Sequence, residues 1–361
     1  MNQPIKVCFD QDFLNFGQNC LGKIEYPGLC NTSGQTSAEI VSWGMELPKN
    51  PSSELIKYAT TLAHGNLRKN SVIQVLGGAA GFDRSSVYSP EKISSLLASY
   101  PESPWIRSAI EIFQAASSKK ATVITGGTQS GIMALISSLY VTSRQLYHQI
   151  DQALNKFATF LPRPGQILES ITPPQLIHVV PAELTVFPGN RWNIAWDKDP
   201  KLLAPCTGFI VVPGVENWGN DGERLEETQW WVSYVPTLER IISIFSQDKD
   251  EIDRTTVVFN GGLLTLAEVY SALLNNAKII FINGSGRLAD LLSFLRQNNW
   301  DLSKINPQKI EEPRLKSALS RKEYLSLLER FVSLAKKREN IYVSDLGNVD
   351  LNTLIEMAPK K

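Results

Sequence analysis

Residues 255–290 read TTVVFNGGLLTLAEVYSALLNNAKIIFINGSGRLAD and contain the pattern that decides the fold. Two short, apolar, β-branched runs each end in a glycine-rich turn, and each turn is followed by a stretch with helical character. Near-continuous apolar strands suit a parallel sheet covered on both faces, and alternating strands and helices are typical of βαβ units. This stretch therefore predicts part of a parallel, helix-covered sheet.

The same alternation extends toward the N-terminus. We expect strands at Ser71–Leu76, Ala121–Thr125, Leu176–Val180, Gly208–Val212, Thr255–Phe259 and Lys278–Ile282. We expect helices at Pro104–Ser118, Gly131 to about Leu161, Leu225–Phe245, Leu264–Asn275 and Arg287–Gln297. The predicted fold class is α/β, a Rossmann-like, doubly wound and mostly parallel sheet with N- and C-terminal additions.

The pattern divides the chain into three parts. Residues 1–67 are predicted to be an N-terminal extension, residues 68–300 the Rossmann-like core, and residues 301–361 a C-terminal addition. Outside the core we expect a strand at Ile5–Phe9, a helix around Ser53–Leu67, a charged amphipathic helix at Glu312–Lys337 and a strand at Asn340–Leu346, at the sheet edge.

Composition excludes several classes of function. Lys+Arg and Asp+Glu both number 36, so the net charge is zero and nothing favours a nucleic-acid or membrane partner. No apolar run approaches the roughly 20 residues of a membrane helix, and the first residues contain no signal stretch, which predicts a cytoplasmic protein. The 4 Cys and 3 His residues lack zinc-ligand spacing, so we expect reduced thiols, no metal site and no cofactor.

Four of the predicted strands end in turns suited to an anion. Glycine allows positive φ and lets backbone N–H groups approach a ligand, and a helix N-terminus favours phosphate. In open α/β sheets, ligands lie at the carboxyl ends of strands. A single turn needs no ligand to explain it, but four in one sheet favour a shared anion site. The candidate phosphate-binding residues are Gly77, Gly78, Gly126, Gly127, Thr128, Ser130, Gly131, Asn260, Gly261, Gly262, Thr265, Gly284, Ser285, Gly286 and Arg287.

Arg287 strengthens this hypothesis. It lies in the first turn of a predicted helix, where a cation opposes the helix dipole by roughly 0.3–1 kcal/mol. A bound phosphate would reverse the sign of that contribution. The alternative is an ion pair with Asp290, three residues further along the helix.

Three other positions have two interpretations each. Glu268 is a candidate general acid/base or ribose ligand, or it closes a capping box with Thr265. In the loop Val215–Arg224, Trp218 is a candidate base-stacking residue and Glu216 a candidate ribose or divalent-ion ligand, or the loop is simply solvated. His178 lies late in its strand, where a core residue is favoured over a catalytic one.

At these residues the sequence resembles the SLOG superfamily, within it the prokaryotic LSDAT branch, which is related to the N-terminal cytosolic domain of TRPM cation channels. The resemblance covers about residues 70–300. The matching motifs are LGG at Leu76–Gly78, TGGTQSGIM at Thr125–Met133, FIVVPG at Phe209–Gly214, ENWG at Glu216–Gly219 and GSGRLAD at Gly284–Asp290.

The resemblance implies a Rossmann-like sheet and a nucleotide-derived ligand, ADP-ribose-like molecules among them. Many members of the family are sensors. Any signal from this chain would then pass to a separate effector protein or stay within a homo-oligomer. LOG-type phosphoribohydrolases, a more distant branch, use P-G-G-x-G-T-x-x-E with a catalytic Glu. Here Asn260 replaces the Pro and Leu264 replaces the Gly directly before Thr, while Gly261, Gly262, Thr265 and Glu268 match, which puts N-glycosidic cleavage in doubt.

The leading functional hypothesis is therefore a sensor of a nucleotide-derived ligand, and the alternative is a hydrolase of the phosphoribohydrolase type that uses Glu268. A dinucleotide-dependent oxidoreductase ranks far behind, because Gly126-Gly127-x-x-x-Gly131 departs from G-x-G-x-x-G. Neither a Walker A pattern nor a G-x-S-x-G elbow is present.

Overall fold

The computed structural model describes most of the predicted core and the C-terminal part. The described residues are 6–9, 22–26, 40–46, 71–77, 103–127, 131–156, 173–181, 185–186, 201–202, 206–212, 230–245, 253–310, 312–348 and 350–357. The predicted helix around Ser53–Leu67 lies outside them, as do the candidate site residues Gly78, Thr128, Ser130, Glu216 and Trp218.

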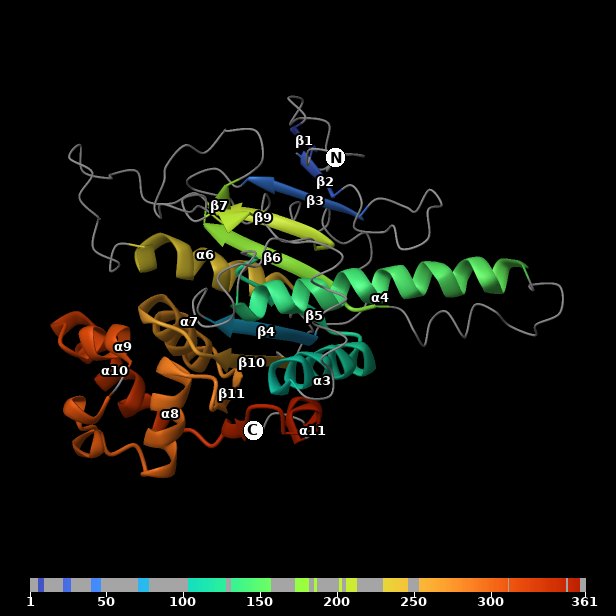
Figure 1. Cartoon of the computed structure of the whole chain (residues 1–361). Helices are drawn as coiled ribbons and strands as arrows, with labels where there is room; N and C mark the ends of the chain where they lie inside the picture. Colours follow the sequence, from blue (N-terminus) through green and yellow to red (C-terminus); the bar gives the residue numbers. More distant parts are fainter. Residues whose placement is uncertain are drawn as a thin grey trace.

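Ten strands of the described residues form one sheet, in the order β1-β2-β3-β9-β6-β5-β4-β10-β11-β12 (Figure 1). Their bounds are β1 Lys6–Phe9, β2 Gly22–Tyr26, β3 Ile40–Glu46, β4 Ser71–Gly77, β5 Thr122–Thr125, β6 Gln175–Pro181, β9 Gly208–Val212, β10 Asp253–Phe259, β11 Lys278–Asn283 and β12 Ile341–Asp345. From β3 to β12 every neighbouring pair is parallel, whereas β1–β2 and β2–β3 are antiparallel. The predicted Rossmann-like α/β fold is confirmed.

The strand order reverses in the middle of the sheet. From β4 the chain proceeds to β5, β6 and β9 in one direction, and then returns to β10 on the other side of β4 before β11 and β12. Such a reversal is a topological switch point, where open α/β sheets leave a crevice for ligands at the carboxyl ends of the strands. The turns after β4 and β10 therefore flank the expected crevice.

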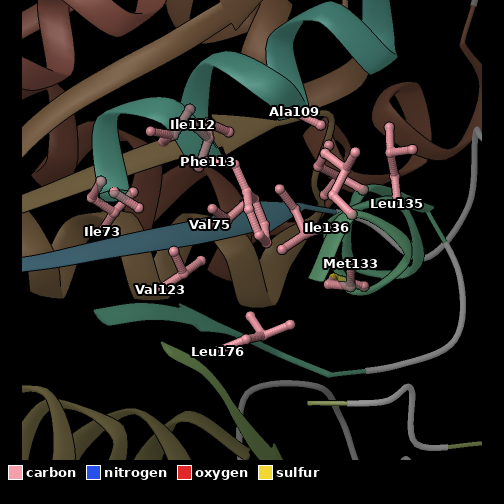
Figure 2. Close-up of a cluster of buried hydrophobic side chains, with 14 of the residues drawn as sticks. Ile73, Val75, Ala109, Ile112, Phe113, Val123, Met133, Leu135, Ile136 and Leu176 are labelled. Atoms are coloured by element: carbon pink, nitrogen blue, oxygen red, sulfur yellow. The ribbon is translucent and has the colours of Figure 1, made fainter. Parts of the chain in front are cut away.

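Helices cover both faces of the sheet. Their bounds are α3 Pro104–Lys119, α4 Gly131–Lys156, α6 Trp230–Phe245, α7 Leu263–Leu274, α8 Arg287–Gln297, α9 Pro313–Leu319, α10 Lys322–Ala335 and α11 Asp350–Glu356. The side chains of Ile73 and Val75 pack toward α3 and α4 (Figure 2). Those of Val72 and Leu76 lie in the clusters formed with α6, α7, α8 and α10. This alternation follows from the two-residue period of a strand.

The C-terminal part differs from the prediction in one respect. The single helix predicted at Glu312–Lys337 is wrong, because Arg321 has extended backbone and separates α9 from α10. The break allows Leu315 and Leu319 of α9 and Tyr324 of α10 to be buried in one cluster. The predicted strand after it is confirmed as β12, at the edge of the sheet. None of the described helices has the length and apolarity that crossing a membrane requires.

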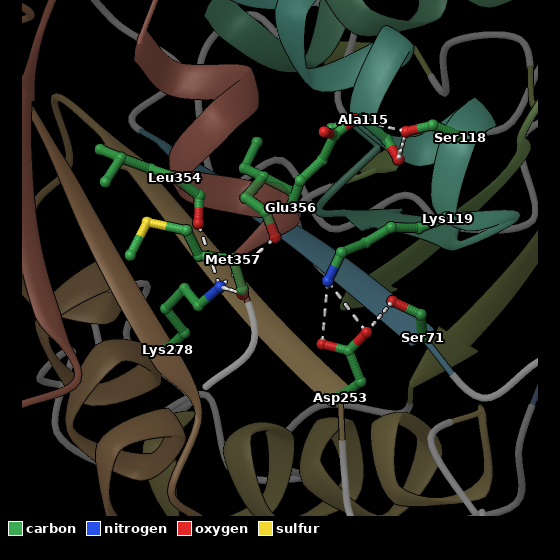
Figure 3. A network of polar contacts seen from close by, with 10 residues as sticks. Ser71, Ala115, Ser118, Lys119, Asp253, Lys278, Leu354, Glu356 and Met357 are labelled. Atoms are coloured by element: carbon green, nitrogen blue, oxygen red, sulfur yellow. Dashed lines mark hydrogen bonds and ion pairs between the residues drawn. The ribbon is translucent and has the colours of Figure 1, made fainter. Parts of the chain in front are cut away.

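The amino edge of the sheet, where the parallel strands begin, holds an ion-pair network (Figure 3). Asp253, the first residue of β10, accepts hydrogen bonds from Lys119 Nζ at 3.0 and 3.2 Å. It also accepts one from Ser71 Oγ at 2.8 Å, which joins the start of β4 to the start of β10.

Side chains from two other elements hold the two ends of α11, and one of them, Lys278, lies at the same edge. Lys278, the buried first residue of β11, donates from Nζ to the carbonyl oxygens of Leu354 (3.0 Å), Ile355 (3.4 Å) and Met357 (Figure 3). Glu111 of α3 accepts a hydrogen bond from the backbone of Leu351. A helix as short as α11 is unstable alone, so this docking keeps it folded.

Candidate functional site

The turns after β10 and β11 form one unit. The Asn260 N–H donates to Ser285 Oγ at 2.9 Å, and the Asn260 carbonyl accepts from the Ala289 N–H at 2.9 Å. Ser285 Oγ in turn donates to the Ile282 carbonyl at 2.6 Å. Two of the four predicted turns are therefore fixed against each other, next to the switch point.

Helix α7 begins at this unit. Gly262 precedes its first residue, and its N–H donates to Thr265 Oγ1 at 3.3 Å. The first N–H groups of an α-helix have no intrahelical acceptor, and they carry the positive end of the helix dipole. The Thr265 side chain thus satisfies the N–H of the cap residue Gly262. The remaining N–H groups of this first turn suit an anion.

The guanidinium of Arg287 lies over the start of α7. A Cβ added to Gly262 would be 3.2 Å from Arg287 Nη2, so only a glycine leaves full room there. Arg287 is the first residue of α8 and has a positive φ of 48°. The structure therefore places one cation beside the N-termini of two helices, which concentrates positive charge at one point of the carboxyl edge.

Two carboxylates bear on the position of an anion here. Asp290, which the alternative interpretation pairs with Arg287, accepts a hydrogen bond from the Gly284 N–H at 2.7 Å. Arg287 forms an ion pair with Glu312, at 3.8 Å between Nε and Oε2. Because Asp290 already lies on the Gly284-Ser285-Gly286 turn, the start of α7 is the better place for an external anion.

The glycines in the turns after β4 and β5 are of two kinds: some lie against neighbouring side chains, and one has open space beside it. A Cβ on Gly77 would lie 2.6 Å from Ile132 Cγ2, and one on Gly127 would lie 2.5 Å from His178 Cβ. Steric contact with neighbouring side chains is therefore enough to explain glycine at both positions, and no ligand is needed. Gly126 differs, because its nearest neighbour would be Met133 Sδ at 4.0 Å. Gly131 begins α4 and has a positive φ of 60°.

His178 supports the β5 turn from inside the core. Its Nδ1 lies 3.0 Å from Thr125 Oγ1, and its Nε2 lies 3.1 Å from Ser137 Oγ. Thr125 Oγ1 also accepts a hydrogen bond from the Gly127 N–H at 3.0 Å. His178 is fully buried, so the prediction of a core histidine is confirmed.

The capping role considered for Glu268 is wrong. The capping box predicted from Thr265 and Glu268 requires Thr265 to be the cap, whereas the cap is Gly262 and Thr265 is the third helical residue. Glu268 lies one turn further along α7 and is only 7 % exposed. Its pKa is raised to about 8, chiefly by burial and also by the nearby Glu239, while Arg254 acts in the opposite direction.

The neighbours of Glu268 place it inside the protein. Arg254, 2 % exposed, forms a two-pronged ion pair with Glu239 at 2.5 and 2.9 Å and donates to Gln74 Oε1 at 2.6 Å. Arg254 lies near the start of β10, five residues before its last residue Phe259. Glu268 thus belongs to a buried polar layer between the sheet and α6.

Sequence reasoning gave no role to two residues that shape the site. Glu312 is the cap of α9, and its pairing with Pro313 in the first turn is a recognisable helix start. Tyr324 of α10 is completely buried, and its pKa is raised by burial and lowered by Arg287, which shows that the two side chains are close enough to interact. Only the position of Glu312 carried a signal in the sequence.

Residues 166–336 match the model of a protein family described as "SLOG in TRPM, prokaryote". This part of the chain is similar to prokaryotic SLOG domains. The match confirms the predicted family resemblance. The matched region includes the unit of Asn260 and Ser285, Arg287, and both α9 and α10, whereas the turns after β4 and β5 precede it. No curated protein matches the chain.

Proposed function

We propose that this SLOG protein is a sensor that binds a nucleotide-derived anion, such as an ADP-ribose-like molecule, with a phosphate at the start of α7. The observation that carries the proposal is the position of the Arg287 guanidinium over Gly262. A cation beside two helix N-termini is unfavourable by itself. A phosphate between them would interact favourably with the guanidinium and with both helix N-termini.

The energetics of such a site are adequate. A hydrogen bond to a charged group contributes about 1.5–3 kcal/mol, and micromolar affinity requires about 8 kcal/mol. Three or four contacts, from Arg287 and the first N–H groups of α7, together with stacking of the base, would reach that value after the cost of ordering the ligand.

The rest of the ligand would extend along the carboxyl edge. Neighbouring strands are about 4.8 Å apart, so the edge from β11 past β10 and β4 to β5 spans roughly 14 Å. Gly126 would contact the ligand at the far end of this span, because its backbone has open space beside it. Glu216 and Trp218 remain the proposed ribose and base contacts.

The burial of Glu268 favours a sensor over a phosphoribohydrolase. A hydrolase needs this carboxylate beside the sugar at the strand ends, whereas it lies in the layer beneath α6. We expect no release of free base from AMP, CMP or GMP above background, as followed by chromatography. Release that disappears in Glu268→Gln would establish the hydrolase instead.

Isothermal titration calorimetry against adenine nucleotides and ADP-ribose tests the proposal. At least one of them should bind in the micromolar range, and Arg287→Ala should weaken it ten-fold or more, which corresponds to about 1.4 kcal/mol. Arg330→Ala, at an exposed position of α10, is the matched control and should bind as the wild type does. Equal affinities of the wild type and Arg287→Ala would refute the assignment.

A further inference from the structure

One carboxylate oxygen connects the anion site to the C-terminal helices. Glu312 Oε2 accepts a hydrogen bond from the Leu315 N–H and thereby caps α9. The same oxygen is 3.8 Å from Arg287 Nε. Glu312 therefore serves the start of α9 and the cation of the proposed phosphate site at once.

These two tasks conflict when a phosphate is present. The phosphate would attract the Arg287 guanidinium and would bring a like charge near Glu312. Charge repulsion would then move the Glu312 carboxylate away from the start of α9. Loss of its cap destabilises a helix, which matters for α9 because a seven-residue helix has little stability of its own.

The adjoining helix α10 contacts the same site from the inside. Tyr324 is completely buried and interacts electrostatically with Arg287. Its helix packs against α7, and α9 packs against α8. The pair α9–α10 thus lies against both helices whose N-termini form the anion site, and a change in Arg287 reaches it directly.

We propose that Glu312 competes internally with the ligand phosphate for Arg287, and that α9–α10 is the element through which binding is transmitted. This proposal rests on the proposed function and specifies its regulation. Coupling between two sites is reciprocal. Because binding of the ligand loosens the cap of α9, an intact cap lowers the affinity for the ligand. Removal of the Glu312 charge therefore raises that affinity.

The test is Glu312→Ser, because serine caps a helix as well as an acidic residue does but carries no charge. Its affinity for ADP-ribose and for inorganic pyrophosphate, measured by calorimetry, should exceed that of the wild type by about three- to ten-fold. The matched control is Asp301→Ser, which makes the same replacement at the capping residue of the one-turn helix Leu302–Lys304 and should leave affinity unchanged.

Hydrogen exchange supplies a second readout. Saturating ADP-ribose should speed exchange of the Leu315 amide in the wild type and leave it unchanged in Glu312→Ser. Wild-type binding with no gain in Glu312→Ser and no change at Leu315 would overturn this proposal and leave the proposed function standing. Binding by Glu312→Ser alone would support internal competition. Binding by neither protein would overturn both.

Discussion

The two edges of the parallel sheet place charges at helix ends in opposite ways. Helix α11, whose C-terminal end lies at the amino edge, has Glu111 at its N-terminus and Lys278 at its C-terminus, as the helix dipole favours. At the carboxyl edge, Arg287 lies beside the N-termini of α7 and α8, where the dipoles oppose it. Charges that complement their helices indicate scaffold, and a charge that opposes them indicates a place for a ligand. The following experiments separate the two.

The largest effect is expected at a glycine of the carboxyl edge that belongs to the scaffold. Gly127→Val should destabilise the protein by about 3 kcal/mol or more, because the new Cβ would lie 2.5 Å from His178 Cβ at a φ of 68°. Thermal unfolding followed by circular dichroism measures this. A stable variant would show that the β5 turn is held less firmly than its contacts imply.

A large loss of stability without a loss of binding is expected at the amino edge. Lys278→Met removes the donor to three carbonyl groups of α11, and we expect a destabilisation of about 2 kcal/mol. Burial lowers the pKa of Lys278 to about 8, with Lys119 contributing, so relief from burying an ammonium offsets part of the loss. Urea unfolding gives the stability, and calorimetry should give an unchanged affinity. A weakened affinity would mean that the two edges are coupled.

Glu268 should affect stability in a pH-dependent way. Its folded-state pKa of about 8 lies above the ordinary value of 4.5, so it stabilises the fold below pH 4.5 and that contribution is lost as the pH rises through 8. At pH 8, Glu268→Gln should therefore raise the free energy of unfolding by at least about 1 kcal/mol. Glu329→Gln, at an exposed position of α10, should change nothing. A wild type whose stability is flat from pH 5 to 8 would contradict a buried carboxyl here.

The smallest change in stability is expected at Gly126, which lies in the same turn as Gly127. Gly126→Val should fold with stability within about 1 kcal/mol of the wild type, since Met133 Sδ at 4.0 Å is the nearest neighbour of the added Cβ. It should nevertheless lower the affinity for ADP-ribose ten-fold, which corresponds to about 1.4 kcal/mol. Unchanged affinity in a folded Gly126→Val would show that the ligand does not extend as far as β5.

The sequence predicted the central strands because they are apolar runs that end in glycine. It missed β2 and β3, which read GKIEY and IVSWGME, because their order depends on distant pairing: β3 lies beside β9, more than 150 residues away. The capping box of Glu268 was wrong because it requires a helix that begins at Leu266 with Thr265 as its cap, whereas the helix begins three residues earlier, at Leu263.

The site was predicted in its parts and not in its arrangement. Each glycine turn has a local signature, so Asn260–Gly262 and Gly284–Arg287 could be selected from the sequence. That Arg287 lies over Gly262 depends on β10 and β11 being neighbours, and that Glu312 approaches Arg287 depends on the path of the chain after α8. Periodicity and composition contain no information about either contact.

The hydrogen bonds from Lys278 to the C-terminal end of α11 have a consequence for folding during synthesis. The first acceptor of Lys278, Leu354, is the 76th residue after it in the chain. At about 5–20 residues per second, a ribosome needs roughly 4–15 seconds to synthesise that interval. Until then the ammonium lies at the start of β11 without the carbonyl groups that hold it in the folded protein. Synthesis of α11 therefore has to precede the closure of this part of the interior, and a chain that stops before Leu354 leaves a charge in its core.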